Sequence, residues 1–469
     1  MIGEDVLYLT VAELGQQIKS RKLSPVDLTE SYLERSKKLG PQLNAYATLT
    51  PDLAMKQAKQ AEAEINAGRY RGPLHGIPYA AKDLLAVPGY PTTWGAKPLV
   101  GQKFDVTATV IQKLEAAGAI LLGKAAMIEL AGGMGYRYAS ASATGPAKNP
   151  WNTQCWTCGS SSGSGAIVAA GLAAFAIGTE TWGSIICPSS FCGISGLRPT
   201  FGRVSRYGAM ALSYSMDKIG PMARSAEDCA AVLEMISGHD DKDRGSLPIF
   251  VADFQRRQEL GLFPPLRIGV VRKPFGDKIP DDVQSAFDGA VNVLRSAGAH
   301  VGEIDMPEGP YEAAAGITIS VEGATAFRNM IESGEIDQLV DPLGRVGAYV
   351  STVIPADDFL RAQQIRSIFQ EKAKDLFKDF DVVTAPSQPV GATKLTANLE
   401  TELTYSDPIG GLGNFCGLPC ISVPCGFTRD RLTVGLQFMG NALEDEKVVA
   451  AAELFQSKTE WHKRRPPLV

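Results

Sequence analysis

Two short segments rich in serine and glycine lie near the middle of the chain. The first is CGSSSG at residues 158–163 and the second is TETWGS at residues 179–184, with an alanine-rich apolar run between them. A serine hydroxyl attacks a carbonyl carbon only when a base removes its proton, and glycine-rich turns bring backbone amides close to the developing oxyanion. The pattern is compatible with a serine nucleophile, but a serine- and glycine-rich segment is a weak signal when it stands alone.

Histidine is the usual base for such a serine, and this chain has only four histidines. His239 lies in a polar turn beside two aspartates, His300 opens a strand and His462 belongs to the polar C-terminal tail. Only His75, in LHGIP, has other residues of interest near it. We expect the other three to be structural or solvated, and if a serine is the nucleophile, its base must be a residue other than histidine.

Lysine can replace histidine as the base, provided that it is neutral at the working pH. Lys82 ends the apolar stretch IPYAAK, where burial would lower its pKa. The competing interpretation is that Lys82 forms an ion pair with the adjacent Asp83 at the end of a strand.

Helices and strands alternate along the chain and must position these residues. We expect helices starting near residues 10 and 24, and others at about residues 52–68, 107–117, 225–238 and 281–297; the alanine-rich run Gly165–Ala176 is expected to be a buried helix. Strands are expected at about residues 77–81, in AILLGKA, on both sides of helix 281–297, and in FDVVTAPSQP, CISVPCGF and LTVGLQFMG. The alternation predicts an α/β fold with a central mixed, mostly parallel sheet covered by helices on both faces.

Composition excludes several classes of protein. The chain has 469 residues, 45% of them hydrophobic, and a net charge of −5 without a basic run, so no nucleic-acid partner is expected. The longest apolar run, residues 166–177, is too short to span a membrane, and the N-terminus lacks the features of a signal peptide. We therefore expect a cytoplasmic location.

The eight cysteines do not form the framework of a small secreted domain. Cys155 and Cys158 form a CxxC pair, but without a second ligand pair or a thioredoxin-like context. All eight are expected to be reduced thiols, with no metal site.

Longer stretches around these residues resemble the amidase signature family, which hydrolyses carboxamides and related C–N bonds. The stretches are GPLHGIPYAAKDLLAVPGYPTTWG (72–95), NPWN (149–152), residues 158–208, DKIGPMARSAED (217–228) and NFCGLPCISVPCGF (414–427). The resemblance covers essentially the whole chain and implies one amidase domain over residues 1–469. Within it, N-terminal helices occupy about 8–68, a catalytic core about 72–228, and the rest of the sheet with its covering helices about 229–469. No cofactor is implied, and we expect a monomer or homodimer.

The catalytic unit of this family is a Ser–cis-Ser–Lys triad. By resemblance, Lys82 is the base, Ser160 is the bridging serine after a cis peptide bond, and Ser184 is the nucleophile. Ser161 is implied as a supporting hydroxyl. The backbone amides of residues 181–183 (Thr181, Trp182 and Gly183) are expected to form the oxyanion hole.

The chain departs from the family pattern beside the nucleophile. Glu180 replaces the usual Asp, Trp182 replaces a Gly and Ile186 replaces an Arg, so the acidic side chain of Glu180 needs another partner. Other departures are Ser162 and Lys218. The surroundings are apolar, and we expect four substrate-binding residues, which are Trp156, Trp182, Ile186 and Asp407.

These residues predict a serine-dependent hydrolase of an uncharged, moderately hydrophobic amide, anilide or carbamate, with ester side activity. A second hypothesis is the glutamine-hydrolysing A subunit of a tRNA-dependent amidotransferase, which anchors glutamine through an Arg and an Asp. Asp407 lies close to that Asp position, and Arg345 is the nearest candidate for the Arg. The sequence is also compatible with a dedicated carbamate (urethane) hydrolase and with a catalytically weak binding protein.

Overall fold

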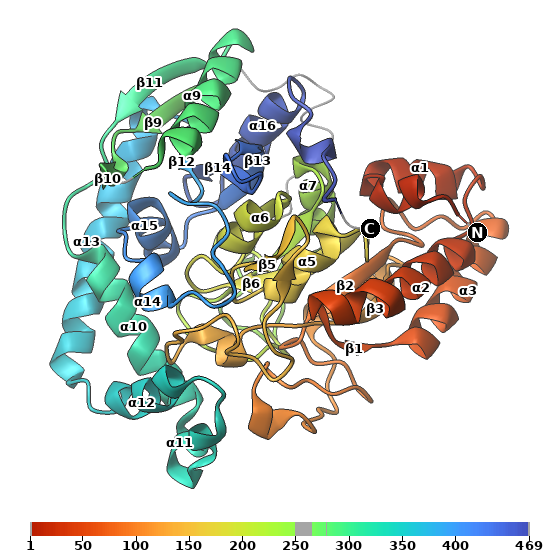
Figure 1. Ribbon diagram of the computed structural model, residues 1–469, viewed down its shortest axis with the longest axis horizontal. Helices are drawn as coiled ribbons and strands as arrows, with labels where there is room; N and C mark the ends of the chain where they lie inside the picture. The colour runs from red at the N-terminus through yellow and green to blue at the C-terminus, as the bar shows by residue number, and fades with distance from the viewer. Residues whose placement is uncertain (1, 249–264, 278, 468–469) are drawn as a thin grey trace.

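An eleven-stranded sheet runs through the centre of the molecule, as seen in a computed structural model that describes residues 2–248, 265–277 and 279–467 (Figure 1). The strands, in the order in which they lie across the sheet, are β1 (Tyr46–Leu49), β3 (Ile120–Ala125), β2 (Pro78–Lys82), β6 (Phe175–Glu180), β8 (Lys218–Ala223), β7 (Ser195–Arg198), β13 (Cys420–Phe427), β14 (Thr433–Gly440), β12 (Val382–Pro386), β9 (Arg267–Val271) and β11 (His300–Ile304). A separate ribbon pairs β4 (Lys148–Asn149) with β5 (Asn152–Trp156), and β10 spans Pro274–Asp277.

The predicted α/β class and mixed sheet are confirmed. Of the ten pairings in the large sheet, β3–β2, β2–β6, β12–β9 and β9–β11 are parallel and the other six are antiparallel. Antiparallel pairing extends further than the sequence suggested because two connections lack a helix. A loop over residues 199–217 joins β7 to β8, and the predicted turn TRDR joins β13 to β14.

Helices fill most of the connections between the strands (Figure 1). They are α1 (Val11–Lys19), α2 (Pro25–Leu43), α3 (Pro51–Asn66), α4 (Thr109–Ala116), α5 (Ser162–Ala169), α6 (Ile186–Cys192), α7 (Ala226–Ile236), α9 (Asp281–Ser296), α10 (Tyr311–Ala326), α11 (Arg328–Ser333), α12 (Pro342–Ser351), α13 (Ala356–Asp379), α14 (Leu399–Glu402), α15 (Pro408–Cys416) and α16 (Asp445–Gln456). Thr10 and Ser24 cap α1 and α2 through their hydroxyls, as their sequence context predicts. No helix of the described ranges is long and apolar enough to cross a membrane.

Both faces of the large sheet carry an apolar core. In β14, Leu436 and Phe438 belong to one buried cluster, whereas Met439 belongs to another that includes side chains of α10, α13 and α15. Neighbouring side chains of a strand point to opposite faces, so the two clusters lie on opposite sides of the sheet. Helices therefore cover both faces, as expected.

The expected helix over residues 165–176 is wrong in its second half. Helix α5 ends at Ala169, and β6 begins at Phe175. Gly171 between them has a φ of +63°, a left-handed conformation that ends a helix and that glycine adopts readily. The shorter helix allows the chain to turn back into the sheet just before the second serine segment.

Parallel pairing of β2 with β6 brings the predicted residues together. Ala81 of β2 lies opposite Ile177 of β6 in the ladder, and both strands run in the same direction. The carboxyl ends of parallel neighbours meet at one edge of a sheet, so Lys82 emerges next to the segment that begins at Thr179.

Candidate active site

Lys82, Ser160 and Ser184 form a continuous row of polar atoms. Lys82 Nζ lies 2.8 Å from Ser160 Oγ, and Ser160 Oγ lies 3.0 Å from Ser184 Oγ. The peptide bond between Gly159 and Ser160 is cis, as the resemblance implied. All three side chains are buried, and only Ser184 reaches the wall of a pocket. The structure thus brings together three residues that lie up to 102 positions apart.

Burial lowers the pKa of Lys82 to about 7, although Asp217 and Glu180 act against this shift through their negative charges. Besides Ser160, the amine contacts Thr179, donating to its carbonyl oxygen at 3.3 Å and to its hydroxyl at 2.9 Å. The amine is therefore held in a fixed position with its neutral form accessible near pH 7.

The competing ion pair between Lys82 and Asp83 does not form. Asp83 Oδ1 instead lies 3.0 Å from Nζ of Lys124, which comes from β3, and Asp83 Oδ2 accepts from the backbone amide of Thr93 at 3.1 Å. Lys82 is the last residue of β2 and the chain turns at Asp83, so the two side chains reach different partners.

Ser161 ties the first serine segment to β6. Its hydroxyl donates to the Thr179 carbonyl oxygen at 3.1 Å and accepts from the Thr179 amide at 3.2 Å, and its own amide donates to the Ser184 carbonyl oxygen at 3.3 Å. These contacts agree with the supporting position expected for Ser161.

The turn before Ser184 presents its backbone to the pocket. Thr181, Trp182 and Gly183 all line the pocket, and Gly183 has a φ of +79°, which reverses the chain just before the nucleophile position. Asp217 Oδ1 accepts from the Thr181 hydroxyl at 2.6 Å, and this bond anchors the start of the turn.

Glu180 holds the other side of this turn. One carboxylate oxygen accepts from the amides of Ile185 and Ile186 at 2.7 and 3.0 Å, and the other accepts from Arg198 at 2.8 Å and from Asn414 at 3.0 Å. Burial raises the pKa of Glu180, but Arg198 and these hydrogen bonds outweigh it and hold the pKa at about 2. Arg198, from β7, is therefore the partner that Glu180 needs in place of an arginine at position 186.

The pocket above Ser184 has a volume of about 420 Å³. Its lining includes two carboxylates, Glu312 and Asp407, and no Arg, Lys or His from the described part of the chain. Trp182 forms part of the wall, and its indole donates to Asp407 at 3.0 Å, while the amide of Asp407 donates to Glu312 at 2.7 Å. Burial raises the pKa of Asp407 to about 6, with the Trp182 hydrogen bond acting in the opposite direction.

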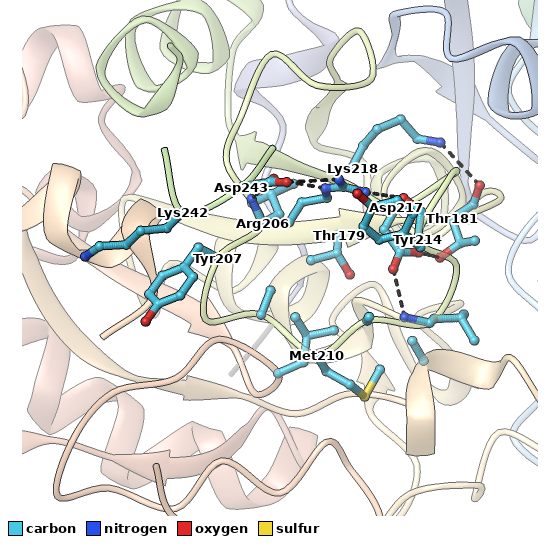
Figure 2. Close-up of a pocket in the computed structure, with 16 residues that line it drawn as sticks. Thr179, Thr181, Arg206, Tyr207, Met210, Tyr214, Asp217, Lys218, Lys242 and Asp243 are labelled. Atoms are coloured by element: carbon cyan, nitrogen blue, oxygen red, sulfur yellow. Dashed lines mark hydrogen bonds and ion pairs between the residues drawn. The ribbon is translucent and has the colours of Figure 1, made fainter. Parts of the chain in front are cut away.

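A second cavity of about 170 Å³ adjoins this pocket (Figure 2). The two share Ala131, Thr181 and Leu212 as lining residues. Figure 2 shows Tyr207 and Lys242 at one end of the second cavity and Thr181 at the other. Thr179 also lines it, so the cavity reaches the residue that holds Lys82.

Two of the four expected substrate-binding residues lie away from the pocket. Trp156 is fully buried behind the first serine segment, where a Cβ atom on Gly159 would come within 3.0 Å of its ring. Ile186 is buried in the apolar cluster formed with α10, α13 and α15. Their apolar character reflects packing behind the site, whereas Trp182 and Asp407 line the pocket as expected.

Arg345 and the histidines are also remote from the pocket lining. The Arg345 guanidinium donates to the carbonyl oxygens of Leu339 and Val340 at 2.7 and 3.3 Å. His75 is buried, and Arg71 donates its backbone amide to the Nδ1 atom of His75 at 3.1 Å.

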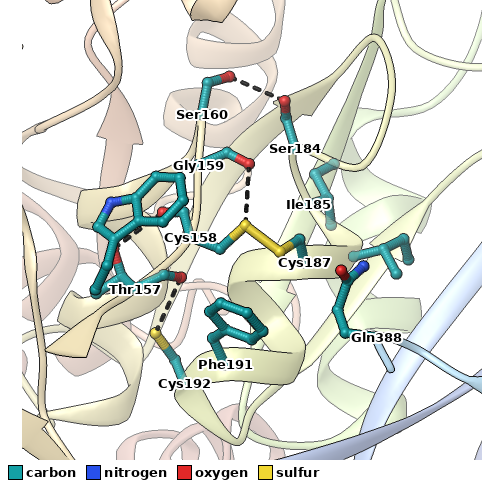
Figure 3. The surroundings of a disulfide bond; sticks show 12 residues. Thr157, Cys158, Gly159, Ser160, Ser184, Ile185, Cys187, Phe191, Cys192 and Gln388 are labelled. Atoms are coloured by element: carbon teal, nitrogen blue, oxygen red, sulfur yellow. Dashed lines mark hydrogen bonds between the residues drawn. A yellow bond between two sulfur atoms is a disulfide. The ribbon is translucent and has the colours of Figure 1, made fainter. Parts of the chain in front are cut away.

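The expectation that all cysteines are reduced is wrong for one pair. Cys158 and Cys187 form a disulfide, whereas the other six cysteines are free and buried. Figure 3 shows the bond directly below Ser160 and Ser184, whose hydroxyls point toward each other. The spacing of the cysteines gave no indication of this pair, because it depends on how the two serine segments approach in space.

Sequence reasoning also missed several residues that support the site. Thr179 and Asp217 contact the amine and the turn, Arg198 pairs with Glu180, and Glu312 lines the pocket. Only the acidic character of Glu180 signalled that a basic partner was required. Within the described ranges, no group of three or more His, Cys, Asp or Glu side chains is arranged to hold a metal ion.

Comparison with known proteins places this geometry in context. The sequence profile of the Amidase family matches residues 27–449. The A subunit of glutamyl-tRNA(Gln) amidotransferase from Acinetobacter baumannii (strain AYE) is 36% identical over 486 aligned residues, which cover 98% of each chain. The solved structure of native peptide amidase from Stenotrophomonas maltophilia superposes with a TM-score of 0.87 at 32% identity, covering 98% of each chain. A bacterial aryl acylamidase of the amidase signature enzymes family superposes with a TM-score of 0.86 at 25% identity, covering 97% of this chain and 98% of that one.

Proposed function

Because the chain belongs to the amidase family, we propose that it is a stand-alone hydrolase that cleaves the C–N bond of an uncharged amide, anilide or carbamate. The observation that carries this proposal is the row formed by Lys82 Nζ, Ser160 Oγ and Ser184 Oγ, which ends at the pocket wall. Ser184 is the nucleophile, Ser160 the bridge and Lys82 the base.

A neutral lysine amine has two N–H bonds and one lone pair. In the structure Lys82 Nζ donates to the carbonyl oxygen and the hydroxyl of Thr179 and to Ser160 Oγ. When the amine is neutral, its two N–H bonds serve the two Thr179 acceptors, and the bond to Ser160 reverses so that the lone pair accepts from the Ser160 hydroxyl. Ser160 Oγ, which donates to Ser184 Oγ at 3.0 Å in the structure, would then accept from the Ser184 hydroxyl across the same distance. Attack by Ser184 on the substrate carbonyl therefore sends its proton to Ser160 while the Ser160 proton moves to Lys82.

The carbonyl oxygen becomes negatively charged in the tetrahedral intermediate. The amides of Thr181, Trp182 and Gly183 lie in the turn just before Ser184, where they stabilise this charge, and one such donor is worth about 3–4 kcal/mol. Lys82 then returns the proton through Ser160 to the leaving amine. Water uses the same relay to hydrolyse the acyl-enzyme on Ser184.

The charges of the pocket favour an uncharged substrate. A substrate carboxylate would lose its hydration beside Glu312 and Asp407 without gaining a cationic partner in the pocket lining. Trp182 provides a flat apolar wall for an aryl or alkyl group. Esters and carbamates have the same acyl carbon and fit the same relay.

A glutamine-hydrolysing component of an amidotransferase is the second candidate. It is favoured by the 36% identity to the Acinetobacter baumannii protein and by Asp407 in the pocket wall. Glutamine carries an α-carboxylate as well as an α-ammonium group. Among the described residues, the pocket lining offers no Arg or Lys to the carboxylate, and Arg345 is bound elsewhere. We therefore rank this function second.

A substrate panel tests the proposal with the purified protein. The panel contains a 4-nitroanilide, an aryl carbamate, an aryl ester and L-glutamine, and a fluorophosphonate probe reports the reactive serine by peptide mapping. We expect turnover of the anilide or carbamate and labelling at Ser184 only. Hydrolysis confined to glutamine would support the second candidate, and no labelling would support a binding protein.

Three variants assign the roles within the relay. Ser184→Ala and Lys82→Ala should each lower kcat by about 10⁴-fold or more. Ser164→Ala is the matched control, because Ser164 is a buried serine just after the first serine segment, and its hydroxyl donates to the Ile177 carbonyl oxygen rather than to the relay. Wild-type rates in either relay variant would refute the mechanism.

A further inference from the structure

The disulfide between Cys158 and Cys187 joins the two segments that carry the serines of the relay. Cys158 precedes Ser160 by two residues, Cys187 follows Ser184 by three, and the bonded cysteines are 29 residues apart in sequence. We propose that this disulfide positions Ser160 relative to Ser184, so that its reduction by a dithiol lowers turnover. The inference rests on the proposed function, because it acts through the relay.

The relay depends on a short distance between two separate segments. Ser160 Oγ and Ser184 Oγ are 3.0 Å apart, and the proton must cross this gap. Behind the serines, the segments are held by the Ser161 amide, which donates to the Ser184 carbonyl oxygen at 3.3 Å, and by Asn149, which donates to the carbonyl oxygens of Trp156 and Phe191.

The disulfide lies on the pocket side of the two segments. Cys158, Gly159, Gly183 and Cys187 all line the pocket, and the two cysteines are buried in the apolar cluster that contains Trp156 and Phe191. Figure 3 shows the sulfur–sulfur bond crossing between them at this level. The disulfide is therefore the covalent tie between the two segments at the pocket lining.

The backbone at Cys158 gives a second reason to expect movement after reduction. Cys158 has a φ of +63°, a left-handed conformation that is uncommon for a residue with a Cβ atom. The disulfide restrains this residue at its Sγ atom. Without the bond, the segment that carries Ser160 loses a restraint two residues before that serine, and a shift of about 1 Å in a catalytic group lowers rates by about 100-fold.

The reduction is ordinary thiol–disulfide exchange. One thiolate of a dithiol attacks Sγ of Cys158 or Cys187, forms a mixed disulfide and displaces the other cysteine as a thiolate. The second thiol of the reagent then closes the reagent's own disulfide and releases the first cysteine. Two electrons and two protons pass from the dithiol to the protein, which gains two thiols.

Access to the bond runs through the substrate pocket. Both cysteines are buried, with 4% and 6% of their surface exposed, yet both belong to the pocket lining. A molecule that occupies the pocket should therefore shield the sulfurs. Enzyme labelled at Ser184 by a fluorophosphonate is expected to be reduced more slowly than free enzyme.

The first experiment establishes the bond. Alkylation of the denatured, unreduced protein followed by peptide mapping should find six modified cysteines and one cross-linked peptide pair, Cys158 with Cys187. Eight modified cysteines in freshly purified, unreduced protein would overturn the proposal.

The second experiment measures the consequence of reduction in the native enzyme. Treatment with dithiothreitol should lower kcat by about 10- to 100-fold and slow the labelling of Ser184 similarly, with KM changing less than about twofold. Reoxidation should restore kcat. Full kcat in enzyme that carries all eight thiols would overturn the proposal. Loss of the near-ultraviolet circular dichroism at the assay temperature would overturn it in favour of a purely stabilising bond.

Variants provide the matched comparison. C158A/C187A should show the same loss of kcat and no further response to the dithiol. Cys192→Ala is the control, because Cys192 is free, buried and within 3.8 Å of the Thr157 carbonyl oxygen beside the same loop. It should keep wild-type kcat and full sensitivity to the dithiol; an insensitive Cys192→Ala enzyme would contradict the assignment.

The two proposals fail in different ways. If the serine relay itself is wrong, the oxidised enzyme does not label at Ser184, whereas hydrolysis confined to glutamine with labelling at Ser184 refutes only the proposed substrate class. If only the disulfide proposal is wrong, Ser184 labels at the same rate before and after reduction.

Discussion

Substitution of Lys82 by methionine should stabilise the protein, and by an amount that decreases as pH rises. Burial lowers the pKa of Lys82 from its ordinary 10.5 to about 7, with Asp217 and Glu180 opposing the shift. Between these two values the unfolded chain binds a proton at this lysine and the folded protein does not. Stability therefore rises with pH over this window, and the full penalty is present below pH 7.

The size of the effect follows from the two pKa values. The penalty is about 4 kcal/mol at pH 7 and about 2 kcal/mol at pH 9, and it disappears above about pH 10.5. Lys82→Met removes it while keeping a side chain of similar length. The variant also leaves the hydroxyls of Thr179 and Ser160 without the amine, which costs about 1–3 kcal/mol at any pH. The pH-dependent part, about 2 kcal/mol between pH 7 and 9, is unaffected by that loss.

Thermal unfolding at constant ionic strength measures this difference. A chain of 469 residues shifts its midpoint by about 1 °C per kcal/mol, so the advantage of the variant over wild type should shrink by about 2 °C from pH 7 to pH 9. Lys124→Met is the control. Lys124 is also a buried lysine, but its Nζ lies 3.0 Å from Asp83, and the substitution leaves a buried carboxylate unpaired. That variant should be destabilised by about 3–5 kcal/mol.

An advantage that is equal at pH 7 and pH 9 would refute the reasoning. It would mean that Lys82 has the same protonation state in the folded and unfolded chain over this range. A lysine that stays charged in the folded protein cannot accept the Ser160 proton, and the proposed base would have to be abandoned.

Three further predictions concern the same site. The value of kcat/KM for an uncharged anilide should fall about tenfold per pH unit below about pH 7 as Lys82 takes up a proton, and a profile that is flat from pH 5 to 8 would contradict this. Trp182→Gly should raise KM for aryl substrates by about 30-fold with little change in kcat, because the apolar wall of the pocket is lost. In the same steady-state assay, Asp407→Asn should change KM less than about twofold. Arg198→Met should lower the free energy of unfolding by about 3–5 kcal/mol, because it leaves Glu180 as an unpaired buried charge; an unchanged melting temperature would show that Glu180 has another cation.

Sequence alone predicted most of the elements and the residues of the relay. The shortage of histidine and the apolar strand before Lys82 pointed to a buried lysine base, and the resemblance supplied its serine partners. The parallel neighbours β2 and β6 then bring Lys82 and Thr179 to the same sheet edge. These features could be predicted because they depend on local patterns. The periodicity of a helix or strand, and the apolar residues that bury a strand end, can be recognised within a short stretch of sequence.

Other features depend on contacts between distant segments. Cys158 and Cys187 pair because the two serine segments meet, and Trp156 packs behind Gly159 although its type suggested a substrate contact. The end of α5 depends on the left-handed conformation of Gly171, which spacing within an alanine-rich run does not reveal. The cysteines and Trp156 were ambiguous in sequence because cysteine and tryptophan occur both in the packed core and at functional sites.

The three departures beside the proposed nucleophile, at positions 180, 182 and 186, are explained by contacts of Glu180 and of Trp182. An acidic side chain at position 180 is useful only if it is both neutralised and hydrogen-bonded, and Glu180 achieves this with Arg198 from β7 together with the amides of Ile185 and Ile186. Because Arg198 of β7 supplies the guanidinium, position 186 can hold an apolar side chain. Ile186 packs in the buried cluster that includes side chains of α10, α13 and α15. Trp182 likewise directs its indole N–H to Asp407, away from the backbone amides of the turn. These changes thus leave the turn before Ser184 anchored and open to the pocket, which is what a serine nucleophile requires.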